Sequence, residues 1–471
     1  MATTLAPILS VNPATEEVIK RYDAFDEPQV DRALDEAQDA FHAWREKSFA
    51  ERAVPMRRLA ALLRERADKY GRLMTLEMGK PITEAKAEIE KCAWNCDFYA
   101  ENAAKFLADE PATSNGKRAY VAFEPLGIVL AVMPWNYPFW QVIRFAAPAF
   151  MAGNAAVLKH ASNVPQSALA IEEVIRDAGF PEGLLRTLLL SGSAVEPLIA
   201  DDRIRAVTLT GSSVTGRRIA ELAGRALKKC VLELGGSDPF IVLADADLEA
   251  AATIGTRARN QNNGQSCIAA KRFLIEDDVV DDFARRFASK VAALRIGDPL
   301  DPATQVGPLA RGDLRDALER QVQESVRMGA RILAGGERWG TRGFFYKPTV
   351  LGDVTPDMPV ANEETFGPVA AVMKVRDADE AVEQANSSEY GLGANLWTKD
   401  ERRADALARR IESGQVFING MVASDPRLPF GGVKHSGFGR ELSAYGIREF
   451  VNIQTIWVGP VQAARPAPQS E

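Results

Sequence analysis

Between residues 206 and 216 the sequence runs Ala206-Val-Thr-Leu-Thr-Gly-Ser-Ser-Val-Thr-Gly216. Its first half has the apolar character of a buried strand, Gly-Ser-Ser is typical of a tight turn, and the remainder begins a helix. A glycine at a strand end lets the backbone approach a ligand, and the free N–H groups of a helix start suit a phosphate. The spacing is Gly-x-x-x-x-Gly rather than the common Gly-x-Gly-x-x-Gly, so plain packing of a strand against a helix explains the stretch equally well.

Strand and helix patterns alternate on both sides of this stretch. The first half of the chain has predicted strands at 127–132, 155–159, 185–190, 206–210 and 229–234, and predicted helices at 166–178, 194–200 and 216–226. The second half has predicted strands at 271–276, 330–334, 370–375 and 415–418, and predicted helices from about 248 and at 278–294, 313–328, 378–386 and 402–411. This alternation indicates an α/β fold built from βαβ units, with parallel sheet covered on both faces. Ahead of these elements the patterns predict a hairpin at 10–20, helices at 27–44, 49–66, 67–78 and 82–106, and a short strand at 120–124.

Length and composition narrow the class of protein. A chain of 471 residues exceeds one ordinary core, so two large domains are expected. A net charge of −7 argues against nucleic acid or an anionic membrane as the main partner. The N-terminus has no signal-peptide pattern, and the apolar runs are far shorter than the roughly 20 residues of a membrane helix, so a cytoplasmic protein is expected. Four cysteines without a Cys-x-x-Cys pair and three scattered histidines predict neither a disulfide framework nor a metal site.

One of the four cysteines, Cys267, lies in the polar loop 260–269. A thiol on such a turn can be partly exposed and flanked by backbone N–H donors, which favours reactivity, although most lone cysteines in polar loops are inert. Thiolate addition to an aldehyde gives a thiohemiacetal that can lose hydride, and the thioester formed next needs a base to activate water. With so few histidines a carboxylate is the expected base. Glu233 ends an apolar strand before Gly235-Gly236 and is the candidate, with a simple capping role as the alternative.

Two polar residues lie at or just after the C-terminal end of the strand predicted at 155–159. Lys159 lies at its C-terminal end, where parallel sheets bind ligands, and could bind a ribose hydroxyl or a phosphate; a solvated surface lysine is the alternative. Ser162 comes three residues later. A carboxylate there would select the free 2′-hydroxyl of NAD, whereas a serine leaves room for the 2′-phosphate of NADP.

Seven motifs, in order, resemble those of the aldehyde dehydrogenase superfamily over nearly the whole chain. They are Pro134-Trp-Asn136, Lys159, Gly211-Ser212 with Gly216, Glu233-Leu-Gly-Gly236, Gly264-Gln-Ser-Cys267, Glu363-Glu364-Thr-Phe366-Gly-Pro368 and Pro429-Phe-Gly-Gly-Val-Lys-His-Ser-Gly-Phe-Gly-Arg-Glu441. The resemblance implies an aldehyde-dehydrogenase-like α/β fold with a Rossmann-type cofactor domain, a second α/β catalytic domain and a small β-extension for oligomerisation.

The resemblance also implies roles for individual residues. Cys267 corresponds to the nucleophile and Glu233 to the general base, while the Asn136 amide and the Cys267 backbone N–H correspond to the oxyanion hole. For the cofactor, NADP or NAD, the resemblance assigns the adenosine ribose to Lys159, the pyrophosphate to Ser212, and the nicotinamide ribose and ring to Glu364 and Phe366. The full cofactor-binding set that we expect is Trp135, Lys159, Ser162, Gly211, Ser212, Glu364 and Phe366.

Within the superfamily, the segments 263–273 and 417–426 most resemble those of bacterial succinate-semialdehyde dehydrogenases. A substrate with a distal carboxylate needs a cation or several donors at the far end of its tunnel. Arg144 and Ser424 match the carboxylate-binding arginine and the substrate-binding serine of that branch. Gln261 stands where some members carry a second arginine, so the substrate carboxylate has one fewer cation, unless Arg427 substitutes for it.

The resemblance predicts domain boundaries and assembly as well. The dinucleotide-binding domain is expected at 1–102 and 126–236, the catalytic domain at 237–436, and the oligomerisation segments and tail at 103–125 and 437–471. The parts near 103–124 and 450–458 would make the contacts of a homodimer or homotetramer. The tail from Gly459 has a composition typical of disorder.

The predicted function is the NAD(P)-dependent oxidation of succinate semialdehyde to succinate. Three alternatives stay open. The substrate could be another aliphatic or ω-carboxy aldehyde, such as glutarate semialdehyde; the chain could be a non-catalytic binding protein on the same fold; or it could transfer the acyl group to coenzyme A. Cys267, Glu233 and Asn136 together speak against a binding protein, and a hydrolytic base at Glu233 disfavours coenzyme A.

Overall fold

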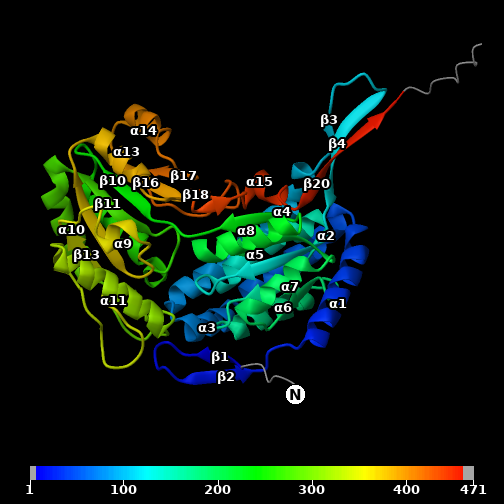
Figure 1. Cartoon of the computed structure of the whole chain (residues 1–471), viewed down its shortest axis with the longest axis horizontal. Helices are drawn as coiled ribbons and strands as arrows, with labels where there is room; N and C mark the ends of the chain where they lie inside the picture. Colours follow the sequence, from blue (N-terminus) through cyan, green and yellow to red (C-terminus); the bar gives the residue numbers. More distant parts are fainter. Residues whose placement is uncertain (1–6, 460–471) are drawn as a thin grey trace, which may run out of the picture.

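The computed structural model describes residues 7–459 and contains two α/β units and a projecting three-stranded sheet (Figure 1). The first unit is built on a six-stranded sheet in the order β19-β9-β8-β5-β6-β7. Its strands are β5 (Ile128–Met133), β6 (Ala155–His160), β7 (Leu185–Thr187), β8 (Ile204–Thr210), β9 (Lys229–Glu233) and β19 (Gly437–Phe438). All neighbours are parallel except β19 and β9, so the predicted parallel sheet is confirmed.

Helices cover this sheet and supply one continuous hydrophobic core. They are α1 (Glu27–Arg45), α2 (Phe49–Glu65), α3 (Ala67–Met78), α4 (Ile82–Phe106), α5 (Pro138–Ala152), α6 (Pro165–Asp177), α7 (Val195–Ala200) and α8 (Ser213–Arg225). The predicted N-terminal hairpin is present as β1 (Ile8–Val11) and β2 (Val18–Tyr22). Helix α8 begins earlier than its predicted start at 216, because Ser212 caps it by accepting a hydrogen bond from the Thr215 N–H.

The second unit has a seven-stranded sheet in the order β12-β13-β14-β11-β10-β16-β17. Its strands are β10 (Asp238–Val242), β11 (Ala270–Glu276), β12 (Arg331–Ala334), β13 (Thr349–Gly352), β14 (Val369–Val375), β16 (Gly393–Trp397) and β17 (Gln415–Ile418). The helices are α9 (Leu248–Asn260), α10 (Val280–Ala292), α11 (Gly312–Arg327), α12 (Pro359–Asn362), α13 (Ala378–Asn386) and α14 (Glu401–Ala408). Alternate residues of the central strands enter two separate cores, one on each face of the sheet.

Three strands of the second sheet, β10, β13 and β16, are not predicted by the sequence patterns. They are short, and proline, glycine or asparagine interrupts them, as in Asp238-Pro239 and Gly393-Ala-Asn395. Such residues lower strand propensity. All three strands are internal to the sheet, so pairing on both sides outweighs their weak local preference.

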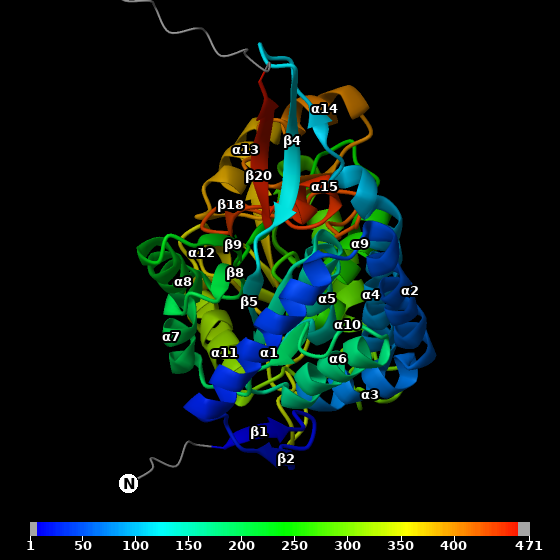
Figure 2. The same cartoon turned by 90° about the vertical axis from the view of Figure 1, so that its right-hand side faces the viewer.

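The third sheet consists of β3 (Glu110–Pro111), β4 (Arg118–Pro125) and β20 (Val451–Val458), in the order β20-β4-β3. Strands β4 and β20 lie antiparallel along their whole length and rise away from the body of the molecule (Figure 2). Strand β15 (Tyr390–Gly391) pairs antiparallel with β18 (Val433–Lys434) in a small separate sheet, and α15 (Ser443–Ile447) precedes β20. The predicted domain boundaries stay a prediction, and residues 460–471 of the predicted tail lie outside the described residues. Within residues 7–459, no helix is both long and apolar enough to cross a bilayer.

Candidate active site

Cys267 lies where two cavities meet. One cavity, of about 460 Å³, is lined by the start of α8, by the loop after β5 and by the segment that precedes β14. The other, of about 260 Å³, is lined by α4, by α5 and by the loop after β17. The Cys267 side chain is partly exposed and belongs to the lining of both. A nucleophile in this position could meet a substrate from one side and a cofactor from the other.

An unusual backbone carries the thiol. Asn262 and Asn263, buried at the beginning of the loop after α9, have φ angles of 53° and 57°. Asparagine tolerates this left-handed region better than most residues. The Asn263 amide donates hydrogen bonds to the carbonyls of Gly79 (2.9 Å) and Pro308 (2.8 Å), and accepts one from the Gly307 N–H (2.7 Å). These contacts hold the cysteine loop to the end of α3 in the first α/β unit and to the segment between α10 and α11 in the second.

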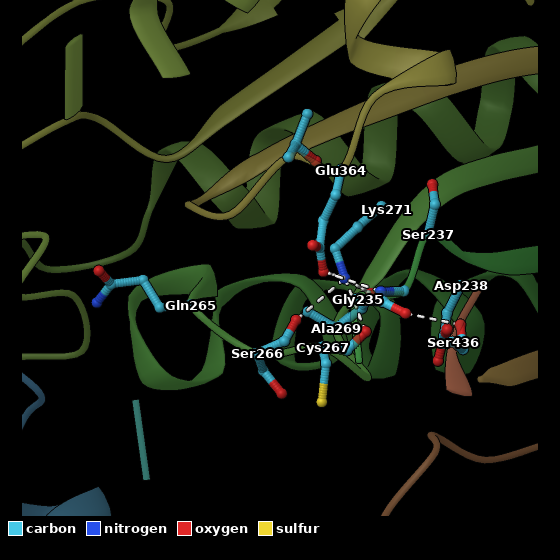
Figure 3. A network of polar contacts seen from close by, with 12 residues as sticks. Gly235, Ser237, Asp238, Gln265, Ser266, Cys267, Ala269, Lys271, Glu364 and Ser436 are labelled. Carbon is cyan, nitrogen blue, oxygen red and sulfur yellow. Dashed lines mark hydrogen bonds and ion pairs between the residues drawn. The ribbon is translucent and has the colours of Figure 1, made fainter. Parts of the chain in front are cut away.

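A buried lysine binds the same loop on the side opposite the thiol (Figure 3). The Lys271 ammonium donates to the carbonyls of Ser266 (3.0 Å), Cys267 (2.8 Å) and Ala269 (3.3 Å). The Cys267 sulfur points away from it. The turn that follows Glu233 packs equally closely, because a Cβ at Gly236 would lie 2.5 Å from the Cys267 carbonyl oxygen. Lys271 and this glycine therefore leave the loop little freedom.

Burial raises the pKa of the Cys267 thiol to about 12. The positive charges of Lys271 and Arg144 lower this pKa, whereas the negative charges of Glu233 and Glu364 raise it. The thiol is therefore protonated at neutral pH in this arrangement, and it needs a base to become a nucleophile.

Glu233 is the carboxylate best placed to serve as that base. It ends β9 and is 2% exposed, and neither of its oxygens has a hydrogen-bond partner among residues 7–459. Burial, with the negative charge of Glu441 second, raises the pKa of Glu233 to about 8, and Arg144 and Arg440 oppose the shift. A buried carboxylate without partners and with a pKa near neutrality is suited to exchange protons rather than to cap a strand.

Asn136, the predicted oxyanion donor, lies in the loop after β5 and lines the larger cavity together with Cys267. Its side-chain amide donates a hydrogen bond to the backbone carbonyl of Gln265 (3.2 Å). Its backbone carbonyl accepts one from the side-chain amide of Asn262 (2.8 Å). Asn136 is thus joined to the cysteine loop on both sides, which keeps its amide beside the thiol.

The larger cavity has the features of a nucleotide site. Gly211, Ser212 and the first turn of α8 form one wall, with backbone N–H groups available to a phosphate. Trp135 and Phe366 form an apolar corner, with their ring centroids 5.7 Å apart and nearly perpendicular planes. Glu364 lines the cavity and accepts a hydrogen bond from the Gly236 N–H (2.9 Å).

Lys159 lies at the carboxyl end of β6, an internal strand of the first sheet, and Ser162 lies in the turn that follows. The Lys159 side chain is 8% exposed, and among residues 7–459 it has no hydrogen-bond or ion-pair partner. Burial lowers the pKa of this lysine. A buried, unpaired cation fits an anionic or hydroxyl-bearing ligand and excludes the alternative of a solvated surface lysine. Ser162 is exposed on the turn that follows.

The smaller cavity contains the residues predicted for the substrate, Arg144 and Ser424. Arg144, on α5, forms a buried ion pair with Glu441 and lies 3.3 Å from Thr210 Oγ1. Its guanidinium also lies over the Phe430 ring, 4.8 Å from the centroid. Gln261 and Ser424 form other parts of the wall. Arg427 is exposed, pairs with Asp425, and is absent from the lining of this cavity.

Comparison with known proteins agrees with this geometry. The model of the aldehyde dehydrogenase family matches residues 2–456. The chain belongs to this family. A relative from Mycobacterium tuberculosis (strain ATCC 25618 / H37Rv), succinate-semialdehyde dehydrogenase [NADP(+)] 1, is 52% identical over 455 residues, which cover 96% of this chain and all of the relative. A similar relative from Mycobacterium ulcerans is also 52% identical, over 457 residues covering 96% of this chain and all of that protein.

Solved structures show the same aldehyde dehydrogenase architecture. The crystal structure of succinic semialdehyde dehydrogenase from Streptococcus pyogenes, in complex with NADP+ as the cofactor, has a TM-score of 0.94 and 39% identity. The match covers 96% of this chain and all of the Streptococcus chain. The predicted fold is therefore confirmed over almost the whole length.

Two lysines of this aldehyde dehydrogenase site are missed by the sequence patterns. Lys91 lies in α4 among alternating charges that look like a solvated helix face, and nothing in the sequence marks it as part of a cavity. Lys271 is completely buried in β11. Its position inside an apolar strand is a detectable signal, since a lysine there must find partners.

Proposed function

We propose that this chain oxidises succinate semialdehyde to succinate with NADP. The observation that carries the proposal is the position of Cys267 at the junction of the two cavities. Asn136 lines the larger cavity with it, and the charge of the buried Glu233 acts on the thiol. The relatives at 52% identity, named as NADP-dependent succinate-semialdehyde dehydrogenases, support the choice of substrate and cofactor. In each turnover one aldehyde and one water become one carboxylate, a hydride passes to NADP+, and two protons are released.

The residues act in sequence on the substrate. Glu233 accepts the thiol proton, and Cys267 Sγ adds to the aldehyde carbon to give a thiohemiacetal. The Asn136 amide and the Cys267 N–H stabilise the oxyanion. Bound NADP+ supplies the hydride acceptor that converts this adduct into a thioester. Glu233 releases the thiol proton to solvent and, ionised again, takes a proton from water as the hydroxide attacks the thioester carbonyl. The departing Cys267 thiolate then takes that proton from Glu233, and succinic acid leaves and loses its own proton to solvent.

The residues present fit a nucleotide. We assign its adenosine ribose to Lys159, because this buried lysine has no other hydrogen-bond or ion-pair partner in residues 7–459. Ser212 and the N-terminus of α8 would take the pyrophosphate, and Glu364 and Phe366 the nicotinamide ribose and ring. Ser162 supports NADP over NAD, since an exposed serine does not repel a 2′-phosphate.

A matrix of aldehydes and cofactors tests the function. Succinate semialdehyde, glutarate semialdehyde and butanal would each be assayed with NADP and with NAD, and kcat/KM would be compared. The proposal expects the highest value for succinate semialdehyde with NADP. A higher value for butanal would reject the substrate assignment, and no reduction of either cofactor with any aldehyde would favour a binding protein.

We also propose that the chain forms a homodimer or homotetramer through the projecting sheet. Strand β20 exposes Ile453 (62%) and Trp457 (51%), which is unusual for large apolar side chains on an edge strand. Light scattering of the Ile453→Lys variant should give a lower mass than the unchanged protein. Ile332→Lys, an exposed isoleucine on edge strand β12, is the matched control. Equal masses for all three proteins would reject this interface.

A further inference from the structure

The smaller cavity contains a cation that no carboxylate neutralises. Lys91, on α4, donates a hydrogen bond from Nζ to Ser424 Oγ (2.6 Å) and lies 4.4 Å from the centroid of the Trp140 ring. Both partners are uncharged, and all three side chains line the cavity that ends at Cys267. Among residues 7–459, Lys91 forms no ion pair.

The acids nearest to Lys91 already have other partners. Glu88 forms a buried ion pair with Lys80 and accepts hydrogen bonds from the N–H groups of Phe139 and Trp140, both at 2.9 Å. Asp425 accepts two hydrogen bonds from Arg427, at 2.9 and 2.5 Å. Neither carboxylate is free to approach Lys91.

The other charged residues of the cavity differ from Lys91. Arg144 is paired with Glu441, and both side chains are buried, so the pair adds little net charge to the wall. Arg257 is exposed and also lines a further cavity of about 530 Å³, and its charge acts on Glu84. Gln261 is neutral. Lys91 is therefore the half-buried cation that is available to a ligand.

We propose that Lys91 and Ser424 together bind the distal carboxylate of the substrate and so determine the preference for ω-carboxy aldehydes. This inference rests on the proposed function. A lysine ammonium has three N–H donors, and Ser424 Oγ occupies one of them. The Ser424 hydroxyl itself has no acceptor among residues 7–459, so it can donate to the same carboxylate. Two adjacent donors, one of them charged, compensate for the neutral residue at 261.

The environment of Lys91 favours an anionic ligand. Burial, followed by repulsion from Arg144, lowers the pKa of Lys91 to about 8, while Cys92, Glu88 and Asp425 oppose the shift. A bound carboxylate would stabilise the charged form and raise this pKa. Without substrate, Lys91 loses its charge as the pH rises above about 8. The KM for succinate semialdehyde should therefore increase above that pH.

The test compares two aldehydes of the same length in matched variants. The variants are Lys91→Met, Lys91→Arg and the control Lys105→Met, which removes an exposed charge from the same helix. Lys91→Met should lower kcat/KM for succinate semialdehyde by about tenfold to a hundredfold, the usual effect of losing a hydrogen bond to a charged group, mainly through KM. Oxidation of butanal should stay nearly unchanged, which also shows that the variant folds. Lys105→Met should leave both aldehydes unaffected.

The pH profile separates binding from a structural role. In the unchanged protein, KM for succinate semialdehyde should rise above pH 8. In Lys91→Arg it should stay level, because a guanidinium keeps its charge. Equal losses for both aldehydes in Lys91→Met, without recovery of selectivity in Lys91→Arg, would overturn the inference.

Inhibition of butanal oxidation by succinate distinguishes failure of this inference from failure of the proposed function. If the enzyme prefers butanal, the proposed substrate is wrong, yet succinate inhibition that Lys91→Met abolishes still supports the anion site. If succinate semialdehyde is preferred and Lys91→Met keeps both that preference and succinate inhibition, only the role of Lys91 is overturned.

Discussion

The two cavities that meet at Cys267 are built in different ways. The larger cavity, here called the nucleotide-side cavity, is built on turns at strand ends, such as Gly211, Ser212 and Gly235, and its other lining residues include Trp135, Arg311, Glu364 and Phe366. The substrate-side cavity consists of side chains from two long helices and a distant loop, and it contains charges: Arg144 paired with Glu441, and Lys91 without a carboxylate partner. A cavity that places backbone N–H groups at strand ends suits the phosphates of a ligand shared by many enzymes. A cavity formed by side chains of helices can change its specificity by single substitutions.

Cys267 belongs to both cavities, so its removal should have the largest effect. Cys267→Ala should lower aldehyde oxidation by at least about a thousandfold, because no other group forms the covalent adduct. Binding of NADPH, followed by fluorescence, should be unchanged. The control is Cys230→Ala, a half-buried cysteine on β9. Appreciable turnover by Cys267→Ala would reject the junction as the reaction centre.

Glu233 lines neither cavity, and in the proposed function it acts as the general base. Glu233→Gln should reduce kcat by about a hundredfold to ten-thousandfold, the usual range for a general base. Because the pKa of Glu233 is raised to about 8 and a base must be unprotonated, kcat of the unchanged protein should increase as the pH rises through 8. A kcat that is independent of pH between 6 and 9 would contradict this role.

The ion pair of the substrate-side cavity should contribute to stability. Arg144→Met leaves Glu441 buried without its partner, and breaking a buried pair costs about 3–5 kcal/mol. Urea unfolding would measure the loss. Arg427→Met is the control, because its pair with Asp425 is exposed on the arginine side and should contribute at most about 1 kcal/mol. Equal losses in the two variants would show that Arg144 is not held mainly by Glu441.

Lys159, which lines neither cavity, tests whether the proposed cofactor site is separate from the substrate-side cavity. Lys159→Met should raise the KM for NADP by about tenfold to a hundredfold, the usual effect of losing a charged hydrogen-bond donor. The KM for succinate semialdehyde should change little, since Lys159 is absent from the substrate-side lining. A comparable rise in both constants would show that the cavities are coupled.

The two cavities also differ in how well the sequence predicts their residues. Most helices and parallel strands were predictable, because their apolar periodicity repeats over many residues. The strand–turn–helix at Gly211 was predictable because its residues are contiguous in the chain. Internal strands such as β10 were not, because pairing on both sides outweighs the weak propensity of Asp238-Pro239. Ser424 was expected from the resemblance, but its contact with Lys91 was not predictable, because the two residues lie 333 residues apart and meet only in the folded chain.

Trapping the acyl-enzyme tests the central claim most directly. Glu233→Gln protein would be mixed with succinate semialdehyde and NADP, quenched in acid and mapped by mass spectrometry. Loss of Glu233 slows both addition of the thiol and hydrolysis of the thioester, so the mixture would be incubated far longer than one turnover of the unchanged protein. The peptide that contains Cys267 should then carry one succinyl group, and only when NADP is present. A peptide without the adduct, or an adduct on Cys230 instead, would contradict the proposal that substrate and cofactor meet at Cys267.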